Sequence, residues 1–255
     1  EPAPSQCLAL AERIGKLHDE YGHEPAVREQ LARALCNATG GEPAPSQCLA
    51  LAERIGKLHD DYGHEPAVRE QLARALFNAT VGEPAPSRRL ALAERIEKLL
   101  DEYGHEPAVR ERLARALANA TAVEPAPSQC LALAERIGKL HDEYGHEPAV
   151  REQLARALFN ATVDEPAPSQ RLALAERIEK LHDEYGHEPA VREELARALL
   201  NAHSAEKNPV KRGALLARLE RLAADFPSDQ AVAAALARAK DRNEEQPGEP
   251  TEDAQ

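Results

Sequence analysis

The sequence contains no tryptophan and no methionine, and it has only three phenylalanines and five tyrosines among 255 residues. Its apolar residues are almost all Ala, Leu, Val and Ile, and its charged residues are mostly Glu and Arg. The shortage of large aromatic side chains argues against a compact aromatic core. Ala, Leu, Glu and Arg at helical spacing are typical of an all-helical array instead, so we expect an all-α fold.

Basic residues are also in deficit, because 32 Lys and Arg stand against 44 Asp and Glu and give a formal net charge of −12. Affinity for nucleic acid comes largely from Lys and Arg, so we expect no nucleic-acid partner. The sequence has no run of 18 apolar residues, and we expect no membrane-spanning segment. It shows no secretory signal. Because it does not begin with Met, we expect it to be part of a longer protein.

Motifs of enzyme active sites are missing from the sequence. It has no glycine-rich phosphate loop, no nucleophile elbow and no Cys-x-x-Cys pair. His18 and His23 recur together later in the chain, but a helix end separates them, whereas a helical zinc site needs two ligands four residues apart and a third ligand. Asp19 and Glu20 lie on a solvated helix end without a pocket that would raise a pKa. We therefore expect no enzyme, no catalytic residue, no metal site and no cofactor.

The dominant feature is a 41-residue repeat that continues without gaps. Five copies are nearly identical, and a sixth copy has diverged, with Pro209 matching Pro168 and Phe226 matching Tyr185. The acidic, proline-containing end of the chain is expected to be a disordered tail. The expected boundaries are 1–41, 42–82, 83–123, 124–164 and 165–205 for the five regular repeats, 206–240 for a C-terminal cap repeat, and 241–255 for the tail.

Each repeat predicts two helices. Pro4 suits the first position of one helix and Pro25 opens the next, because proline is favoured at the first helical position. Gly22 between them is expected to stop the first helix with a left-handed backbone. The apolar pattern places Arg28 and Gln30 on the outer side of the second helix.

Two short helices cannot bury both of their faces alone, so the repeats must stack on one another as an α-solenoid. In the cap repeat, Asn208 is expected to cap the first helix before Pro209. Charges at Lys240, Asp241 and Arg242 are expected to prevent a seventh repeat from docking. Repeat 1 has no such change, so its apolar face needs cover. Either a longer protein continues there, which we favour, or two copies of the chain meet through it.

The cysteines do not form an obligatory disulfide framework. Three of them share one repeat position, which carries Arg89 or Arg171 in other copies, so a bridge is not required there. Equivalent positions in neighbouring repeats are expected about 10 Å apart, beyond the Cα separation that a disulfide tolerates. We expect free thiols in a cytoplasmic protein. The cysteines are Cys7, Cys36, Cys48 and Cys130.

The second helix, "AVREQLARAL", resembles the first helix of the tetratricopeptide repeat, with Leu31 in the family's Leu–Gly pair and Leu35 at its Tyr position. The period is longer than the family's 34 residues, a difference that we assign to the "GGEPAPS" loop. Gly22 stands in place of the family's closing proline, although Pro227 occupies that place in the cap repeat. The alternative is a helical-hairpin repeat of independent origin. The resemblance implies a right-handed superhelix that binds peptides or partner helices in its concave groove.

In that family the corresponding helix lines the concave surface, which implies a row of partner-binding residues that we name the candidate stripe. Its Arg residues would hold carboxylates and its Asn residues would bond a peptide backbone. The alternative is that Glu29 and Arg33 form an ordinary i,i+4 surface pair and that Asn37 only ends a helix. The Asn-Ala-Thr sequences also match a glycosylation sequon, which we interpret as helix ends. The candidate stripe consists of Glu29, Arg33, Asn37, Glu70, Arg74, Phe77, Asn78, Glu111, Arg115, Asn119, Glu152, Arg156, Phe159, Asn160, Glu193, Arg197 and Asn201.

These observations favour a non-catalytic scaffold or recognition arm that binds a protein or peptide in the concave groove. Its affinity would be built from many weak contacts. A second hypothesis is a structural spacer or a self-associating array, joined through the uncovered face of repeat 1.

Overall fold

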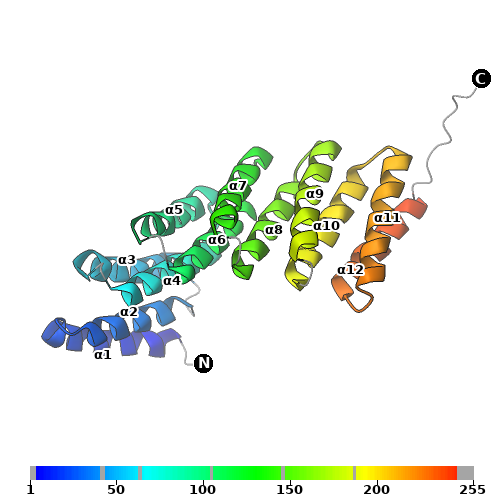
Figure 1. The fold of residues 1–255 in the computed structure, drawn as a ribbon. Helices are drawn as coiled ribbons and strands as arrows, with labels where there is room; N and C mark the ends of the chain where they lie inside the picture. Colours follow the sequence, from blue (N-terminus) through cyan, green and yellow to red (C-terminus); the bar gives the residue numbers. More distant parts are fainter. Residues whose placement is uncertain are drawn as a thin grey trace, which may run out of the picture. The chain divides into compact units, whose positions relative to one another are not determined.

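The described residues form twelve α-helices and no β-strand, which confirms the all-α fold expected from the sequence. Figure 1 shows the helices as consecutive pairs along the chain, one pair for each repeat. A computed structural model describes residues 4–40, 44–62, 65–103, 106–144, 147–185 and 188–245. The helices are α1 (Pro4–Tyr21), α2 (Pro25–Gly40), α3 (Pro45–Tyr62), α4 (Pro66–Gly82), α5 (Pro86–Tyr103), α6 (Pro107–Thr121), α7 (Pro127–Tyr144), α8 (Pro148–Val163), α9 (Pro168–Tyr185), α10 (Pro189–Ala205), α11 (Pro209–Asp225) and α12 (Gln230–Glu245).

Proline sets the start of every helix except α12. Its missing N–H costs nothing at the first helical position, where no intrahelical partner exists. The residue before it, such as Glu65, has an extended backbone and makes no side-chain cap. Asn208 differs, because its side-chain oxygen accepts hydrogen bonds from the backbone N–H groups of Val210 and Lys211. The helix cap predicted at Asn208 is thus confirmed.

The chain divides into two compact units, Glu1–Val123 and Glu124–Gln255, and each holds three helix pairs. In unit 1, α2 packs on α1, α3 and α4, and α4 packs on α5 and α6. In unit 2, α8 packs on α7, α9 and α10, and α10 packs on α11 and α12. Over the described residues, the backbones of successive odd-numbered helices of a unit do not approach each other, and these helices meet only through side chains such as Glu12 and Arg54. Each unit is an α-solenoid segment in which the even-numbered helices lie closer together than the odd-numbered ones.

The core of each unit consists of aliphatic and small side chains. Ile55, Leu76 and Ile96 in unit 1 are almost completely buried, and so are Ile137 and Leu158 in unit 2. Alanines fill the centres of the even-numbered helices and are fully buried in every regular repeat, which lets neighbouring helix axes approach closely. The apolar faces of the helices therefore form the core, except on α1, where Leu10 and Leu17 are exposed.

Gly22 ends α1 without the left-handed backbone expected from the sequence, since no described glycine has a positive φ. A Cβ atom there would lie 2.7 Å from the carbonyl oxygen of His18 and 3.1 Å from its Nε2. Close approach, rather than a left-handed turn, therefore requires glycine. The Nη1 atom of Arg28 donates to the carbonyl oxygen of Gly22 at 2.5 Å and holds the turn.

The expected outer position of Arg28 is wrong, because only 5% of its surface is exposed. The next repeat covers this side chain and supplies its partners. Gln30 is exposed as expected, but its counterpart Gln71 is buried because repeat 1 packs against α4. Burial of these polar positions thus depends on the neighbouring repeat, not on the helix alone.

The last helix is longer than the expected cap repeat. Helix α12 continues to Glu245, so residues 241–245 are helical and do not belong to the tail assigned from composition. The remainder of the expected tail, residues 246–255, lies outside the described residues.

Candidate functional site

A charged and aromatic contact joins neighbouring repeats within each unit, and we call it the junction. Nε of Arg28 donates to both carboxylate oxygens of Glu65, at 2.9 and 3.1 Å. Its guanidinium also lies over the ring of Tyr62, 4.2 Å from the ring centroid. Pairing and stacking both use the planar guanidinium, which suits Arg rather than Lys. Equivalent contacts join Arg69 to Tyr103 and Glu106, Arg151 to Tyr185 and Glu188, and Arg192 to Phe226 and Asp229.

The first histidine of each pair belongs to the junction. His18 packs edge-on against Tyr62 with 6.3 Å between ring centroids, and His59 packs against Tyr103 in the same way. The second histidine behaves differently, because the side chain of His23 is exposed. In repeat 1 the two histidines therefore lie in different surroundings, and the counterparts of His23 in the other regular repeats are outside the described residues. The described residues contain no group of three metal-ligating side chains. Four junction histidines have a buried Nε2 without a hydrogen-bond partner: His18, His59, His141 and His182.

The Asn-Ala-Thr sequences form a second link between repeats. The side-chain nitrogen of Asn78 donates to the hydroxyl of Thr39 at 2.8 Å, and this hydroxyl donates to the carbonyl oxygen of Cys36. Asn201 makes the same bond to Thr162 at 2.9 Å. The amide nitrogen of these asparagines is therefore already used inside the protein. Hydrogen bonding of these asparagines to the backbone of a peptide ligand stays a prediction. Their side-chain oxygen would accept that bond, because the side-chain nitrogen already donates to a threonine.

The repeat position shared by cysteine and arginine also has a structural role. Sγ of Cys130 donates to the carbonyl oxygen of Glu124 at 3.2 Å, and Nε of Arg171 donates to the equivalent carbonyl of Glu165 at 2.5 Å. Both side chains donate a hydrogen bond to a backbone carbonyl in the loop that precedes the first helix of a repeat. This common hydrogen bond explains why the two residue types replace each other. All four cysteines are free thiols.

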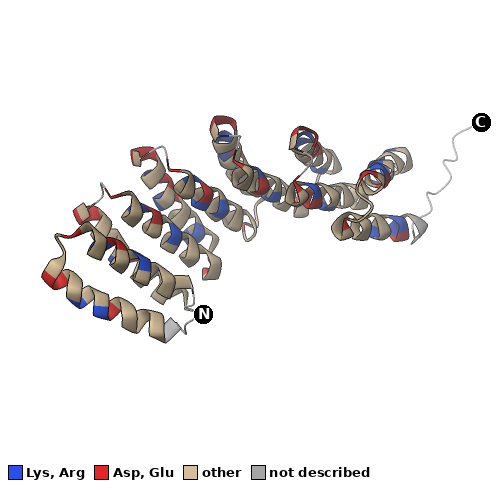
Figure 2. Ribbon diagram, turned by 60° about the horizontal axis from the view of Figure 1, so that its bottom comes forward, with Lys and Arg blue, Asp and Glu red and all other residues tan. Residues whose placement is uncertain are grey.

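The charged residues of the candidate stripe lie on the outer side of the even-numbered helices. Arg33, Glu70 and Arg74 are exposed, and Glu29 is half-buried. These residues make no ion pair among the described side chains, whereas Glu111 pairs with Arg115 at 3.0 Å. Because the even-numbered helices of one unit pack on each other, their stripes form one surface in each unit. Figure 2 shows acidic and basic residues interspersed along the helices.

The aromatic members of the candidate stripe are covered by arginines of the following repeat. The guanidinium of Arg112 lies over Phe77, 5.6 Å from the ring centroid, and that of Arg197 lies over Phe159 at 4.0 Å. Phe159 is buried and Phe77 is half-buried. These rings therefore take part in internal cation–π contacts. A ligand that used them would first have to displace an arginine.

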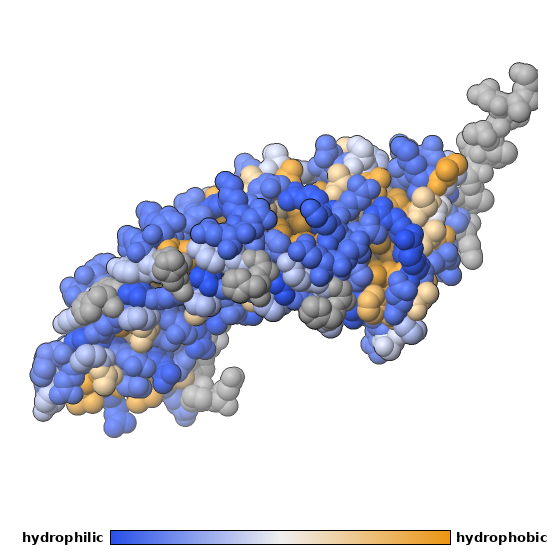
Figure 3. Space-filling model, in the orientation of Figure 1, coloured by the Kyte–Doolittle hydropathy of each residue, from blue (hydrophilic) through white to orange (hydrophobic). Residues whose placement is uncertain are grey.

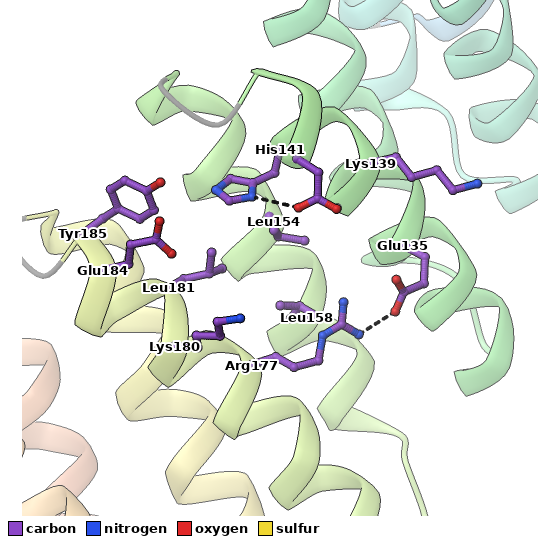
Figure 4. A pocket seen from close by; sticks show the side chains of 12 residues that line it. Glu135, Lys139, His141, Leu154, Leu158, Arg177, Lys180, Leu181, Glu184 and Tyr185 are labelled. Atoms are coloured by element: carbon purple, nitrogen blue, oxygen red, sulfur yellow. Dashed lines mark hydrogen bonds and ion pairs between the residues drawn. The ribbon is translucent and has the colours of Figure 1, made fainter.

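Grooves occur on the side of the odd-numbered helices. One groove of about 510 Å³ lies between α7 and α9, and Figure 4 shows Leu154 and Leu158 of α8 between these helices. Arg177 and Glu135 form an ion pair across it. Similar grooves lie between α9 and α11 and between α3 and α5. They recur because the backbones of successive odd-numbered helices lie apart and only their side chains meet, so we interpret them as a consequence of the architecture.

Sequence reasoning missed the contact between Arg28, Tyr62 and Glu65, because it placed Arg28 on the outer side of its helix and assigned no role to Glu65. The signal that identifies them is their recurrence in the regular repeats together with an opposite charge at constant separation.

Comparison with protein-family models, with curated proteins and with solved structures gave no match to this chain. The helical-repeat architecture therefore rests on the packing of consecutive helix pairs. None of the described helices has the length and hydropathy needed to cross a membrane.

Proposed function

We propose that the chain is a non-catalytic scaffold of tetratricopeptide-like repeats that binds a protein or peptide along the candidate stripe. The observation that carries the proposal is the set of stripe charges without an internal partner, which includes Arg33 and Arg74 in unit 1. Charged side chains that the fold does not use are available to recognise a ligand. We also propose a cytoplasmic location, which the four free thiols support.

The packing of the even-numbered helices supports the family assignment. In the tetratricopeptide repeat, the helix that resembles "AVREQLARAL" lines the inner surface. In this chain the corresponding helices pack closely on each other across repeats, whereas the odd-numbered helices meet only through side chains. A surface between closely spaced helices is pre-formed, so a ligand costs little ordering entropy when it binds. The ligand should carry charges of both signs, because columns of Glu and Arg lie side by side.

The test is selection of peptides from a random displayed library against the whole protein. The selected peptides are then measured on a variant that carries Arg33→Glu and Arg74→Glu. We expect affinity to fall at least about tenfold, since two favourable charge contacts become repulsive. The matched control carries Lys57→Glu and Lys98→Glu, which are exposed on odd-numbered helices. Equal loss in both variants, or no selected peptide above background, contradicts the proposal.

A second candidate function is a structural spacer or a self-associating array. The observation that favours it is the apolar surface of α1, where Leu10, Leu17 and Tyr21 are exposed. Sedimentation of the whole protein separates the two functions, because self-association through α1 must be abolished by Leu10→Glu.

A further inference from the structure

Repeat 1 exposes a surface that is buried in the repeats that follow it. We call the side of a repeat that faces the preceding repeat its leading face, and the opposite side its trailing face. Leu10 and Leu17 on the leading face of repeat 1 are 50% and 51% exposed, whereas their counterparts Leu51 and Leu58 are each 7% exposed. Figure 3 shows the corresponding apolar surface at the α1 end of unit 1. The leucines on the leading face of repeat 2 are buried because repeat 1 packs over them.

The contact between repeats 1 and 2 shows which chemistry covers a leading face. The trailing face of repeat 1 supplies four polar groups: a guanidinium, an imidazole, a carboxylate and a hydroxyl. The guanidinium and the imidazole both pack on a tyrosine of repeat 2, and the guanidinium also pairs with a glutamate. The carboxylate pairs with an arginine of repeat 2. The hydroxyl accepts a hydrogen bond from an asparagine. These groups belong to Arg28, His18, Glu12 and Thr39, and their partners on repeat 2 are Tyr62, Glu65, Arg54 and Asn78.

The leading face of repeat 1 carries the complete receiving set. Tyr21, Glu24, Arg13 and Asn37 stand at the positions of Tyr62, Glu65, Arg54 and Asn78, and all four are exposed. Glu24 has only a 4.0 Å contact with the exposed His23, and Arg13 makes no ion pair among the described residues. The apolar patch on repeat 1 is thus surrounded by the same four types of polar residue that contact a trailing face at the junction of repeats 1 and 2.

The chain itself offers no free trailing face of this kind. The cap repeat has alanine at three of the four supplying positions: Ala217 replaces the carboxylate, Ala223 the imidazole and Ala233 the guanidinium. Within the units, the trailing arginines of the earlier repeats are engaged by the following repeat, and Arg110 is engaged as well. A second copy of the chain therefore lacks the groups that would complete the exposed set.

We propose that the leading face of repeat 1 is a docking surface for the trailing face of a helical hairpin of this repeat type on a partner molecule. The partner presents an arginine to Glu24 and Tyr21, a carboxylate to Arg13 and a hydroxyl to Asn37. Its apolar side chains cover Leu10 and Leu17. The cap, in contrast, has alanine at three of the four positions that supply these polar groups.

The test mixes the whole protein with a probe that has a free trailing face and a disabled leading face. The probe is a fluorescent copy of residues 1–164 with Glu24→Arg, so that Glu135, His141, Arg151 and Thr162 of repeat 4 are uncovered. We expect a 1:1 complex in sedimentation. Glu24→Arg in the whole protein should weaken it at least about tenfold, because two guanidinium groups then meet. Glu20→Arg is the matched control and should have no effect, since its counterparts Asp61 and Glu102 stay exposed in stacked repeats.

A second measurement applies even where the probe fails to fold. A copy of residues 83–123, which contain no cysteine, is fused before Glu1, and alkylation of Cys7 is followed in the fusion and in the unmodified protein. Cys7 is half-buried, whereas its counterpart Cys48 is buried behind repeat 1. We expect the fused repeat to slow alkylation of Cys7 about tenfold, in line with burial of its counterpart, and Glu24→Arg to restore the rate.

Three outcomes overturn the proposal. Unchanged alkylation of Cys7 in the fusion means that the face is not complementary to a trailing face. Protection in the fusion without binding of a folded probe means that the contact forms only within one chain. Dimerisation of the unmodified protein that Leu10→Glu abolishes and Glu24→Arg leaves intact means that a second copy covers the face. Peptide binding by the candidate stripe is tested through Arg33 and Arg74, which do not belong to the leading face, so none of these outcomes decides that proposal.

Discussion

Arg28 of one repeat lies over the ring of Tyr62 in the next, with its central guanidinium carbon 4.2 Å from the ring centroid. The same arginine pairs with Glu65, which follows that tyrosine by three residues. The phrase "YGHEPAVREQLARAL" carries all three groups, so one copy can receive a junction and supply the next within a unit. Stacking of the repeats therefore accounts for its repetition.

Replacing a junction arginine by lysine should destabilise the contact between repeats. Arg69→Lys keeps the charge but loses the planar group that stacks on Tyr103 and pairs with Glu106. We expect a loss of about 1–3 kcal/mol in the opening free energy of the helices on either side. Hydrogen exchange of the amides in α4 and α5 measures this opening free energy locally. A local measurement is needed because a repeat array does not have to unfold in one step. Arg74 is exposed on the same helix, and Arg74→Lys should change the opening free energy by less than about 0.5 kcal/mol.

Glu194 should cost stability at neutral pH. Burial raises the pKa of its carboxyl, so the folded protein favours the protonated form. The contribution of Glu194 is therefore most favourable below the ordinary value of 4.5 and declines as the pH rises through the raised pKa. Glu194→Gln places the residue of the equivalent Gln153 there and should stabilise the protein at pH 7 by about 0.5–1 kcal/mol.

Urea unfolding of the Glu194→Gln variant at pH 4 and pH 7 measures this effect. The gain should be present at pH 7 and much smaller at pH 4. Glu193→Gln, at the exposed neighbouring position, serves as the control. A gain that is equal at both pH values would contradict the burial of an ionised carboxylate as its cause.

His203 should make the end of unit 2 sensitive to acid. It replaces the threonine of the other regular repeats, is 1% exposed, and neither ring nitrogen has a hydrogen-bond partner. Burial lowers the pKa of this imidazole, and the charges of Arg212 and Arg242 lower it further. The folded state favours neutral histidine, so stability declines as the pH falls below the ordinary value of 6.5.

The measurement for His203 is hydrogen exchange of α11 and α12 at pH 7.5 and pH 5.5, corrected for the intrinsic rates. His203→Thr restores the residue of the other repeats and should remove a large part of the difference between the two conditions. His23→Thr removes an exposed histidine and should leave the difference intact. If His203→Thr and His23→Thr change the difference between pH 7.5 and pH 5.5 equally, protonation of His203 is not the cause of the acid sensitivity.

One thiol should react much faster than the other three. Burial raises the pKa of Cys36 and of Cys130 to about 11. At pH 8 only about one molecule in a thousand then carries the reactive thiolate at such a site. Cys48 is buried as well, and Cys7 alone is half-buried. Alkylation of the native protein should show one fast phase that Cys7→Ser abolishes, whereas a fast phase that survives this change would contradict the burial of the other thiols.

The helices and repeats were predictable because their signals are local. Pro4 and Pro25 mark helix starts, Asn208 marks a cap, and the leucine spacing defines an amphipathic helix. These features depend on a few neighbouring residues and need no knowledge of the rest of the chain.

The junction was not predictable in the same way. An amphipathic pattern treats Arg28 as a solvent-facing charge, and only the position of the next repeat shows that Tyr62 and Glu65 enclose it. The cover of Phe77 by Arg112 has the same origin, because it depends on how far a long side chain of another repeat extends. The exposure of Arg33 and Arg74, in contrast, followed from the helix face alone.

The most direct test of the junction is a double-mutant cycle with Arg151→Met and Glu188→Gln in the whole protein. The two side chains are buried against each other at the contact between repeats 4 and 5. Hydrogen exchange of α8 and α9 should give a coupling energy of about 1.5–3 kcal/mol. The exposed pair Glu152 and Arg156, treated in the same way, should give less than about 0.5 kcal/mol. A coupling energy near zero for Arg151 and Glu188 would contradict the conclusion that the repeated phrase exists to hold neighbouring repeats together.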